Sequence, residues 1–231
     1  MEFNLQIICL MICFAVMANG TAITRTDCGS DKACYSDPER CDPSADTCDF
    51  FLSYKENGGN VDFEIVGEPT NAEGWIAVAF SYDKKMGNDS GVMCVNDGSS
   101  TSIKTFYNEG QVNRPGNTVG LSGMSSATND GILSCSFSRS KSMSNNPEFF
   151  DLAMDFFLLM GTGPCTGGTC TEHETLPKAS LMKVDFDSTD DINAGDPDHS
   201  SHESHDSATI DVSGKVSVLV AVMVLAAVIG L

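Results

Sequence analysis

The sequence is poor in positive charge and has no long hydrophobic run between its two ends. Only 13 of the 231 residues are lysine or arginine, against 32 aspartates and glutamates, so the formal net charge is −19. A chain this acidic is not expected to bind nucleic acid or an anionic membrane surface, because both attract basic patches. The confinement of apolar runs to the ends excludes a multi-helix membrane protein.

Common catalytic motifs are also absent. The sequence contains no glycine-rich phosphate loop, no Gly-x-Ser-x-Gly and no His-Glu-x-x-His. We therefore do not expect a catalytic domain of the classes that these motifs mark.

The N-terminal residues 1–22 have the pattern of a secretory signal peptide. An apolar run from Leu5 to Met17 precedes small residues, and cleavage is expected after Gly20 or Ala22. The region before the run is atypical, because it carries Glu2 and no basic residue. A buried helix is the alternative, and the flanking residues disfavour it.

The C-terminal residues 207–231 end in an apolar run of 16 residues, Val216 to Leu231. A helix of that length spans about 24 Å, less than the hydrocarbon core of a bilayer. A short terminal run behind a polar spacer is typical of a GPI-attachment signal, with Asp206 or Ser207 as the expected attachment point. A single-pass tail anchor is the alternative. Both predict a protein on the extracellular face of the plasma membrane.

The residues between the folded region and this tail, 188–206, are rich in aspartate, serine and histidine. They lack aromatic residues, so we predict a disordered acidic stalk. His199, His202 and His205 recur at every third position, a pattern that would bind a transition metal weakly. A solvated acidic spacer is the simpler alternative.

Eight cysteines remain once the signal peptide is removed, and an even number in a secreted chain predicts disulfides. Four of them crowd into one short polar segment, and two bracket a Thr-Gly-Gly-Thr loop that would close locally. The last two are left to pair with each other across a long loop. In chain order the eight are Cys28, Cys34, Cys41, Cys48, Cys94, Cys135, Cys165 and Cys170. A zinc site is disfavoured, because thiolate ligands require a reducing compartment.

Residues 28–187 consist of short apolar segments separated by Gly, Asn, Asp and Ser. Residues 61–66 and 76–80 alternate between apolar and polar or small side chains, which is typical of half-buried strands. Further strands are expected at 51–55, 92–95, 102–107 and 133–137. The segment from Phe149 to Met160 is long enough for a helix, but its phenylalanines also suit a buried strand. The pattern predicts an all-β, immunoglobulin-like β-sandwich held by disulfides.

Three stretches of this region resemble the DOMON family: CDFFLSYK after the cysteine cluster, GWIAVAFSYDKKMGNDSGVMCV, and the glycine loop before TEHE. The resemblance is strongest to the extracellular DOMON domains of ferric-chelate reductases and of their receptor-associated brain paralogue. It implies a β-sandwich that binds haem b or sugars.

The resemblance also implies a haem ligand pair, Met86 and His173. His173 is the only histidine of the folded region, and imidazole–thioether ligation raises the reduction potential of a haem. Both ligands would face one apolar slot walled by Trp75, Phe80 and the segment from Phe149 to Met160. The alternatives are an ordinary loop methionine and a surface histidine.

Two functions are therefore expected. The first is one-electron transfer through haem b, with a membrane cytochrome, an iron chelate or another redox protein as partner. The second is a non-catalytic surface module that binds a membrane receptor or a glycan. Asn88, in the sequon Asn-Asp-Ser, is the expected glycosylation site, and a glycan there would crowd the pocket mouth near Met86.

Overall fold

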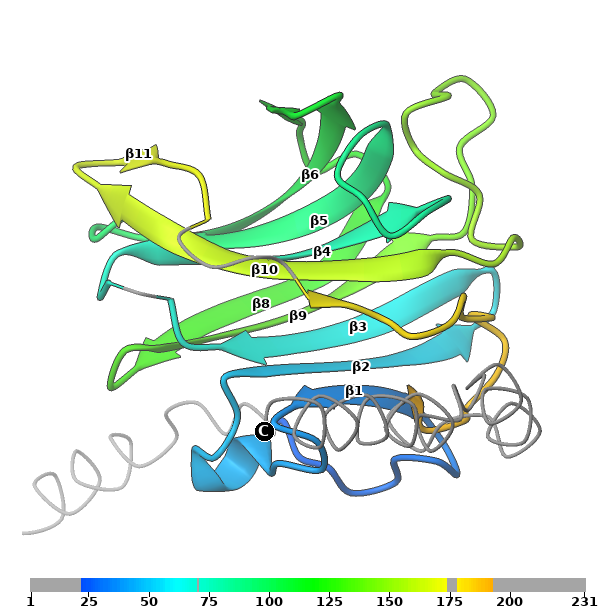
Figure 1. Cartoon of the computed structure of the whole chain (residues 1–231), viewed down its shortest axis with the longest axis horizontal. Helices are drawn as coiled ribbons and strands as arrows, with labels where there is room; N and C mark the ends of the chain where they lie inside the picture. Colours follow the sequence, from blue (N-terminus) through cyan, green and yellow to red (C-terminus); the bar gives the residue numbers. More distant parts are fainter. Residues whose placement is uncertain (1–21, 70, 174–177, 193–231) are drawn as a thin grey trace, which may run out of the picture. The chain divides into compact units, whose positions relative to one another are not determined.

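The computed structural model describes residues 22–69, 71–173 and 178–192, which form two stacked β-sheets (Figure 1). Across these described ranges the only helix is a short 3-10 turn, η1 (Pro43–Ala45). The predicted all-β sandwich is confirmed. The signal peptide and the C-terminal anchor segment predicted above lie outside the described residues.

One layer is a five-stranded antiparallel sheet in the order β1-β2-β3-β9-β8. Its strands are β1 (Ala33–Asp37), β2 (Phe50–Asn57), β3 (Asn60–Gly67), β9 (Ile132–Ser140) and β8 (Leu121–Asn129). A two-residue turn joins β2 to β3 through Gly58 and Gly59, both at positive φ. Such a turn matches the twist of paired strands and favours glycine.

The other layer is a seven-stranded sheet in which β11, β10, β4, β5, β6 and β7 lie in that order and β12 pairs with β10. Its strands are β4 (Gly74–Ser81), β5 (Asp89–Asn96), β6 (Thr101–Glu109), β7 (Val112–Pro115), β10 (Phe157–Thr166), β11 (Thr169–Cys170) and β12 (Lys178–Ala179). In β4, the central strand of the predicted motif, every second residue points into the sandwich.

The core lies between the sheets and follows from this alternation. In β9, Leu133, Cys135, Phe137 and Arg139 are buried, while the serines between them point outward. The facing strands contribute Ile76, Val78 and Phe80 from β4 and Val92 from β5. The interior is closely packed with aromatic rings. Phe63, for example, stacks on Phe137 with ring centroids 5.3 Å apart.

Two boundaries differ from the sequence-based expectation. Strand β10 begins at Phe157, so the first eight residues of the segment from Phe149 to Met160 form a turn-rich loop whose aromatic rings are buried in the core. The folded domain also extends beyond its predicted end at Asp187. Asp191 forms an ion pair with Arg25 at 2.5 Å, and Ile192 packs against the core, so the first stalk residues are part of the domain.

Three of the predicted disulfides form, and each closes a loop of only a few residues. They are Cys28–Cys34, Cys41–Cys48 and Cys165–Cys170. The prediction that Cys94 and Cys135 are also disulfide-bonded is wrong in this structure, because both are free, buried thiols. They are hydrogen-bonded neighbours across the core, one from each sheet. Pairing the two cysteines that the other loops left over therefore identified residues that are neighbours in the fold, but it did not predict that both thiols are free.

Candidate functional site

Met86 lies in the loop between β4 and β5. The last turn of the loop is held by two hydrogen bonds, from the Gly87 N–H to Asp89 Oδ2 (2.7 Å) and from the Asn88 N–H to the Asn108 carbonyl (2.8 Å). Gly87 and Asn88 both have positive φ, at 145° and 58°, conformations that glycine and asparagine adopt more easily than other residues. Met86 is partly exposed, and Asn88 beside it is exposed.

His173 follows the β10–β11 hairpin, which the Cys165–Cys170 disulfide closes. After the hairpin, the Thr171 carbonyl accepts a hydrogen bond from Trp75 Nε1 at 3.0 Å. His173 comes two residues later and is partly buried. Trp75 therefore ties the segment before His173 to the start of β4.

The strand register places Met86 and His173 at opposite ends of β4. Trp75 stands at the beginning of this strand and Ser81 at its end, and six residues of strand span about 20 Å. The Met86 loop leaves the far end, whereas the His173 segment is anchored near the beginning. The described residues thus place the two predicted ligands over one strand but not side by side.

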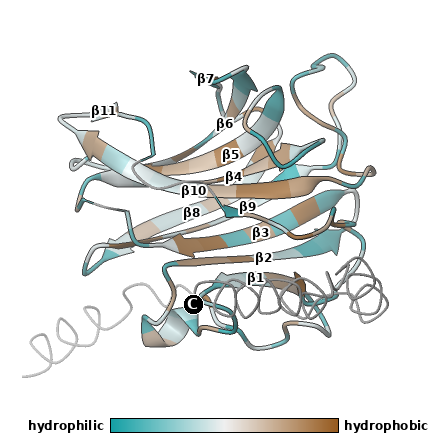
Figure 2. Cartoon of the chain, viewed as in Figure 1, coloured by the Kyte–Doolittle hydropathy of each residue, from teal (hydrophilic) through white to brown (hydrophobic). Residues whose placement is uncertain are grey.

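The outward face of the seven-stranded sheet between these ends is apolar, although the outer face of a sandwich is ordinarily polar. Figure 2 shows hydrophobic stretches along β4, β5 and β10. We call this face the apolar floor. It consists of one partly buried residue, Trp75, and of Ala77, Ala79, Met93, Val95, Phe106, Leu159 and Cys165, each less than 10% exposed.

Two glycines shape the apolar floor. A Cβ added at Gly91 would lie 2.2 Å from the tip of the Phe106 ring, and one at Gly163 would lie 2.5 Å from the Trp75 ring. Both rings therefore lie directly on the sheet, in space that any other residue would fill. They extend the apolar floor as a low, broad surface.

The predicted walls of the slot need a correction. Trp75 belongs to the apolar floor, but Phe80 is fully buried on the opposite side of β4, with its ring 5.7 Å from that of Phe63. Successive residues of a strand point to opposite faces, so Trp75 and Phe80 do not line the same slot. The segment from Phe149 to Met160 is divided in the same way, since Phe156 faces the core and Leu159 the apolar floor.

Sequence reasoning missed Asp89, a fully buried carboxylate at the start of β5. Its Oδ2 accepts hydrogen bonds from the Gly87 N–H and from Asn108 Nδ2 (3.2 Å). Its Oδ1 has no hydrogen-bond partner among the described residues. Asp89 thus holds the turn that carries Met86. Its sequence signal was a charged residue directly before an apolar strand, which by itself does not indicate burial.

Arg139 was also missed, and it is the largest fully buried side chain. Its guanidinium lies 3.8 Å from the Phe149 ring centroid and 4.9 Å from that of Phe80, and it donates to the Phe150 carbonyl at 2.8 Å. Burial lowers the pKa of Arg139 to about 9, and the charge of Asp151 offsets this only in part. Arg139 therefore clamps the loop that precedes β10 to the core.

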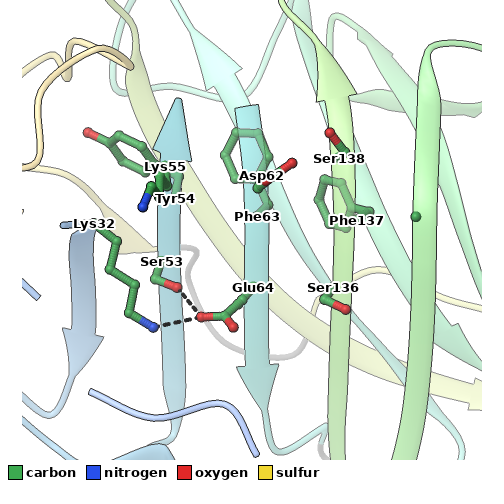
Figure 3. A pocket seen from close by; sticks show the side chains of 11 residues that line it. Lys32, Ser53, Tyr54, Lys55, Asp62, Phe63, Glu64, Ser136, Phe137 and Ser138 are labelled. Atoms are coloured by element: carbon green, nitrogen blue, oxygen red, sulfur yellow. Dashed lines mark hydrogen bonds and ion pairs between the residues drawn. The ribbon is translucent and has the colours of Figure 1, made fainter. Parts of the chain in front are cut away.

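A second candidate surface lies on the outer face of the five-stranded sheet (Figure 3). It is a shallow groove of about 420 Å³. Lys32 Nζ and Ser53 Oγ both donate to Glu64 Oε2, at 2.7 and 2.6 Å, and Ser136 and Ser138 project beside them. The groove therefore presents hydroxyl and charged groups, whereas the apolar floor presents almost none.

Several predicted site residues lie outside the described residues: His199, His202, His205, Asp206 and Ser207. Among the residues that are described, no group of three His, Cys, Asp or Glu side chains is placed to hold a metal ion. That same part of the chain contains no helix long and apolar enough to cross a membrane.

Comparison with known proteins identifies relatives over most of the chain. Residues 46–161 match the family model described as DOMON domain. The human DOMON domain-containing protein FRRS1L is 34% identical over 170 residues, which cover 72% of this chain and 56% of that protein. The putative ferric-chelate reductase 1 of Xenopus laevis is 30% identical over 157 residues, which cover 68% of this chain and 26% of that protein. The chain thus matches about half of the first relative and about a quarter of the second.

Among solved structures, the cytochrome b domain of pyranose dehydrogenase from Coprinopsis cinerea is similar with a TM-score of 0.45 and 14% sequence identity. The match covers 64% of this chain and 82% of that domain.

Proposed function

The chain belongs to the DOMON family, and from that premise we propose that it is an extracellular, membrane-anchored protein that binds haem b and transfers single electrons. The relatives named as ferric-chelate reductases support a redox role. We propose an electron-transfer role for this domain, which matches about a quarter of those proteins.

The observation that carries the proposal is the apolar floor between the Met86 loop and the His173 segment. Haem is a flat, largely apolar group, and its burial requires an apolar surface of this kind. Small residues along β4, Ala77 and Ala79, keep the surface low where bulky side chains would obstruct a macrocycle. A polar outer face would not provide an apolar surface on which the macrocycle could be buried.

The chemistry of the donors suits haem iron: Met86 supplies a thioether, and His173 supplies the one imidazole within residues 28–187. Because their segments lie at opposite ends of β4, ligation by both requires the Met86 loop and the His173 segment to approach each other over the apolar floor. Haem b provides a reversible one-electron couple, and ligation by these two side chains raises its potential. In this proposal the Asp89 turn holds Met86, and the Trp75–Thr171 hydrogen bond holds the approach to His173.

The membrane anchor, the signal peptide and the glycan at Asn88 belong to the same proposal. Asn88 is exposed, as a glycosylated asparagine must be. Treatment of intact cells with phosphatidylinositol-specific phospholipase C tests the anchor. Release of the protein supports a GPI anchor at Asp206 or Ser207, whereas retention supports a membrane-spanning tail.

Absorption spectroscopy tests the haem proposal. The full chain is expressed in cultured cells, offered haem, and measured in the oxidised and reduced states. We expect a low-spin b-type spectrum that is lost in Met86→Ala and in His173→Ala. Met124→Ala, which removes an exposed methionine from β8 in the other sheet, should leave it unchanged. A well-folded protein that takes up no haem would contradict the proposal.

The groove of the five-stranded sheet favours a second function, that of a non-catalytic module binding a glycan or a membrane receptor. Its serine hydroxyls and the Glu64 carboxylate are groups that hydrogen-bond sugar hydroxyls. Ser136→Val with Ser138→Val should abolish binding to a glycan panel under this alternative and leave haem uptake intact. Retained glycan binding by this double variant would show that the groove is not the glycan-binding site.

A further inference from the structure

The lysines without an acidic partner gather around the apolar floor. Among the described residues, seven of the basic side chains form ion pairs with aspartate or glutamate. Arg139 is buried in the core. The remaining four have no ion pair within the described ranges: Lys84, Lys85, Lys104 and Lys183.

These four lysines lie on or beside the face of the seven-stranded sheet that carries the apolar floor. Lys84 and Lys85 directly precede Met86 in its loop. Lys104 lies opposite Met93 in the register of β6 and β5, so it rises from the same outward face as the apolar floor. Lys183 lies in the segment that runs along the free edge of β10. In a chain with a net charge of −19, such unpaired positive charge at one face requires an explanation.

Two of these lysines converge on one ring. Lys84 Nζ lies 5.1 Å from the Phe157 ring centroid, and Lys183 Nζ lies 5.8 Å from the same centroid. Phe157 begins β10 opposite Ser81, two residues before Leu159 of the apolar floor and on the same side of the strand. Two ammonium groups therefore lie within 5.8 Å of one ring centroid where the apolar floor ends.

We infer that Lys84 and Lys183 bind the carboxylates of the ligand on the apolar floor, which under the proposed function are the two propionates of haem. This inference rests on that proposed function. The two propionates extend from one edge of the macrocycle, so two ammonium groups around the Phe157 ring match them in number and charge. The apolar floor takes the macrocycle, and the lysines take its charged edge at the solvent boundary.

The charge pairing explains why these lysines lack partners inside the protein. An acidic neighbour would neutralise them and repel a dianionic ligand. Some acidic residues of the domain pair with basic residues elsewhere, as Asp31 does with Lys55 on the five-stranded sheet, and Asp83 beside Lys84 forms no ion pair among the described residues. The pairing also predicts that affinity depends on ionic strength, because contacts between exposed charges are screened by salt.

Haem titration of the full chain tests the inference. Binding is followed by Soret absorbance and by quenching of the single tryptophan, Trp75, which lies on the apolar floor. The variant Lys84→Gln/Lys183→Gln is compared with Arg40→Gln/Lys55→Gln, which removes the same charge from other surfaces. Each protein is titrated with haem at low and high salt, and with haem dimethyl ester, which has no free carboxylate.

We expect Lys84→Gln/Lys183→Gln to bind haem about tenfold more weakly at low salt, with a flatter salt dependence and unchanged absorption bands. The control variant should match the wild type, and all three proteins should bind the ester alike. Equal haem affinity of variant and wild type would overturn the inference and leave the haem proposal standing. Equal weakening for haem and ester would also overturn it, since that result indicates a disturbed fold. A wild type that binds no haem would refute the proposed function itself.

Discussion

Trp75 Nε1 donates a hydrogen bond to the Thr171 carbonyl across 96 positions of sequence. This contact joins the start of β4, at one end of the apolar floor, to the segment that leads to His173. The same ring lies over Gly163 and fills the space that a side chain there would need. Trp75 thus fixes both the surface of the apolar floor and the approach of the second proposed ligand.

Trp75→Phe should retain the ring and lose the hydrogen bond. We expect the free energy of unfolding to fall by about 1 kcal/mol, the typical contribution of one such bond. Hydrogen exchange should become faster at the Thr171 amide, which donates to the Pro164 carbonyl, and haem affinity should fall. Exchange indistinguishable from that of the wild type would show that the bond does not hold this segment.

Arg139→Ala should destabilise the domain strongly. The substitution removes a hydrogen bond to the Phe150 carbonyl and the contacts with two aromatic rings, and it leaves a cavity in the core. We expect a loss of about 3 kcal/mol or more, measured by urea denaturation.

Arg40→Ala is the matched control for this experiment. Arg40 is exposed, and within the described ranges its side chain forms an ion pair with no residue other than the neighbouring Glu39, so its removal should leave the unfolding midpoint unchanged. A small effect of Arg139→Ala, similar to that of the control, would mean that the loop before β10 is held by other contacts.

The thiols of Cys94 and Cys135 should be unreactive in the native protein. Burial raises the pKa of the Cys94 thiol, and its contact with Cys135 raises it further, so the reactive thiolate is scarce. A thiol reagent should detect none in the folded chain and both after unfolding without reductant. Cys135→Ala should lower the count after unfolding by one. Detection of neither thiol in the unfolded wild type would show that the pair is oxidised.

Asp97 should make the turn between β5 and β6 sensitive to acid. Hydrogen bonds from the Ser99 hydroxyl and from the Ser99 and Ser100 amides lower the pKa of Asp97 to about 2, below its value in an unfolded chain. A carboxyl whose folded pKa is depressed stabilises the fold above about pH 4, and this contribution is lost as the pH falls toward 2. Asp97→Asn should therefore reduce the dependence of the urea midpoint on pH within that window.

Asp130→Asn serves as the control, because the Asp130 carboxylate has no hydrogen bond among the described residues. It removes a charge from the turn between β8 and β9. Equal pH profiles for Asp97→Asn and wild type would contradict the role assigned to this turn.

The sandwich could be predicted because its central strands alternate clearly. Residues 61–66 and 76–80 show a period of two in the sequence, and both form strands of the core. Strand β8 was not predicted, because its side chains are small, polar and mostly exposed and give no hydrophobic period. Strand β1 was not predicted for a different reason, because it lies within a polar segment rich in cysteine.

The site was only partly predictable. The resemblance to the DOMON family selected Met86 and His173, but the apolar floor depends on residues of four strands that meet only in the folded sheet. The alternation of residues 76–80 assigned Ala77 and Ala79 to the second face of β4, yet nothing local showed that neighbouring strands continue this face as one apolar surface. Buried charge was the least predictable feature. Arg139 sits in a serine-rich strand, and its aromatic neighbours come from distant positions.

The register shift in β8 has a consequence for aggregation of the protein at high concentration. This strand is the last of the five-stranded sheet, and between Leu121 and Asn129 it carries no charged side chain. Such an edge is a template for pairing with another chain and for fibre growth. The register shift between Ser122 and Ser125, with Gly123 at φ +58°, bends the strand out of a straight template. In this chain, resistance to aggregation at that edge depends on a backbone distortion rather than on charge repulsion.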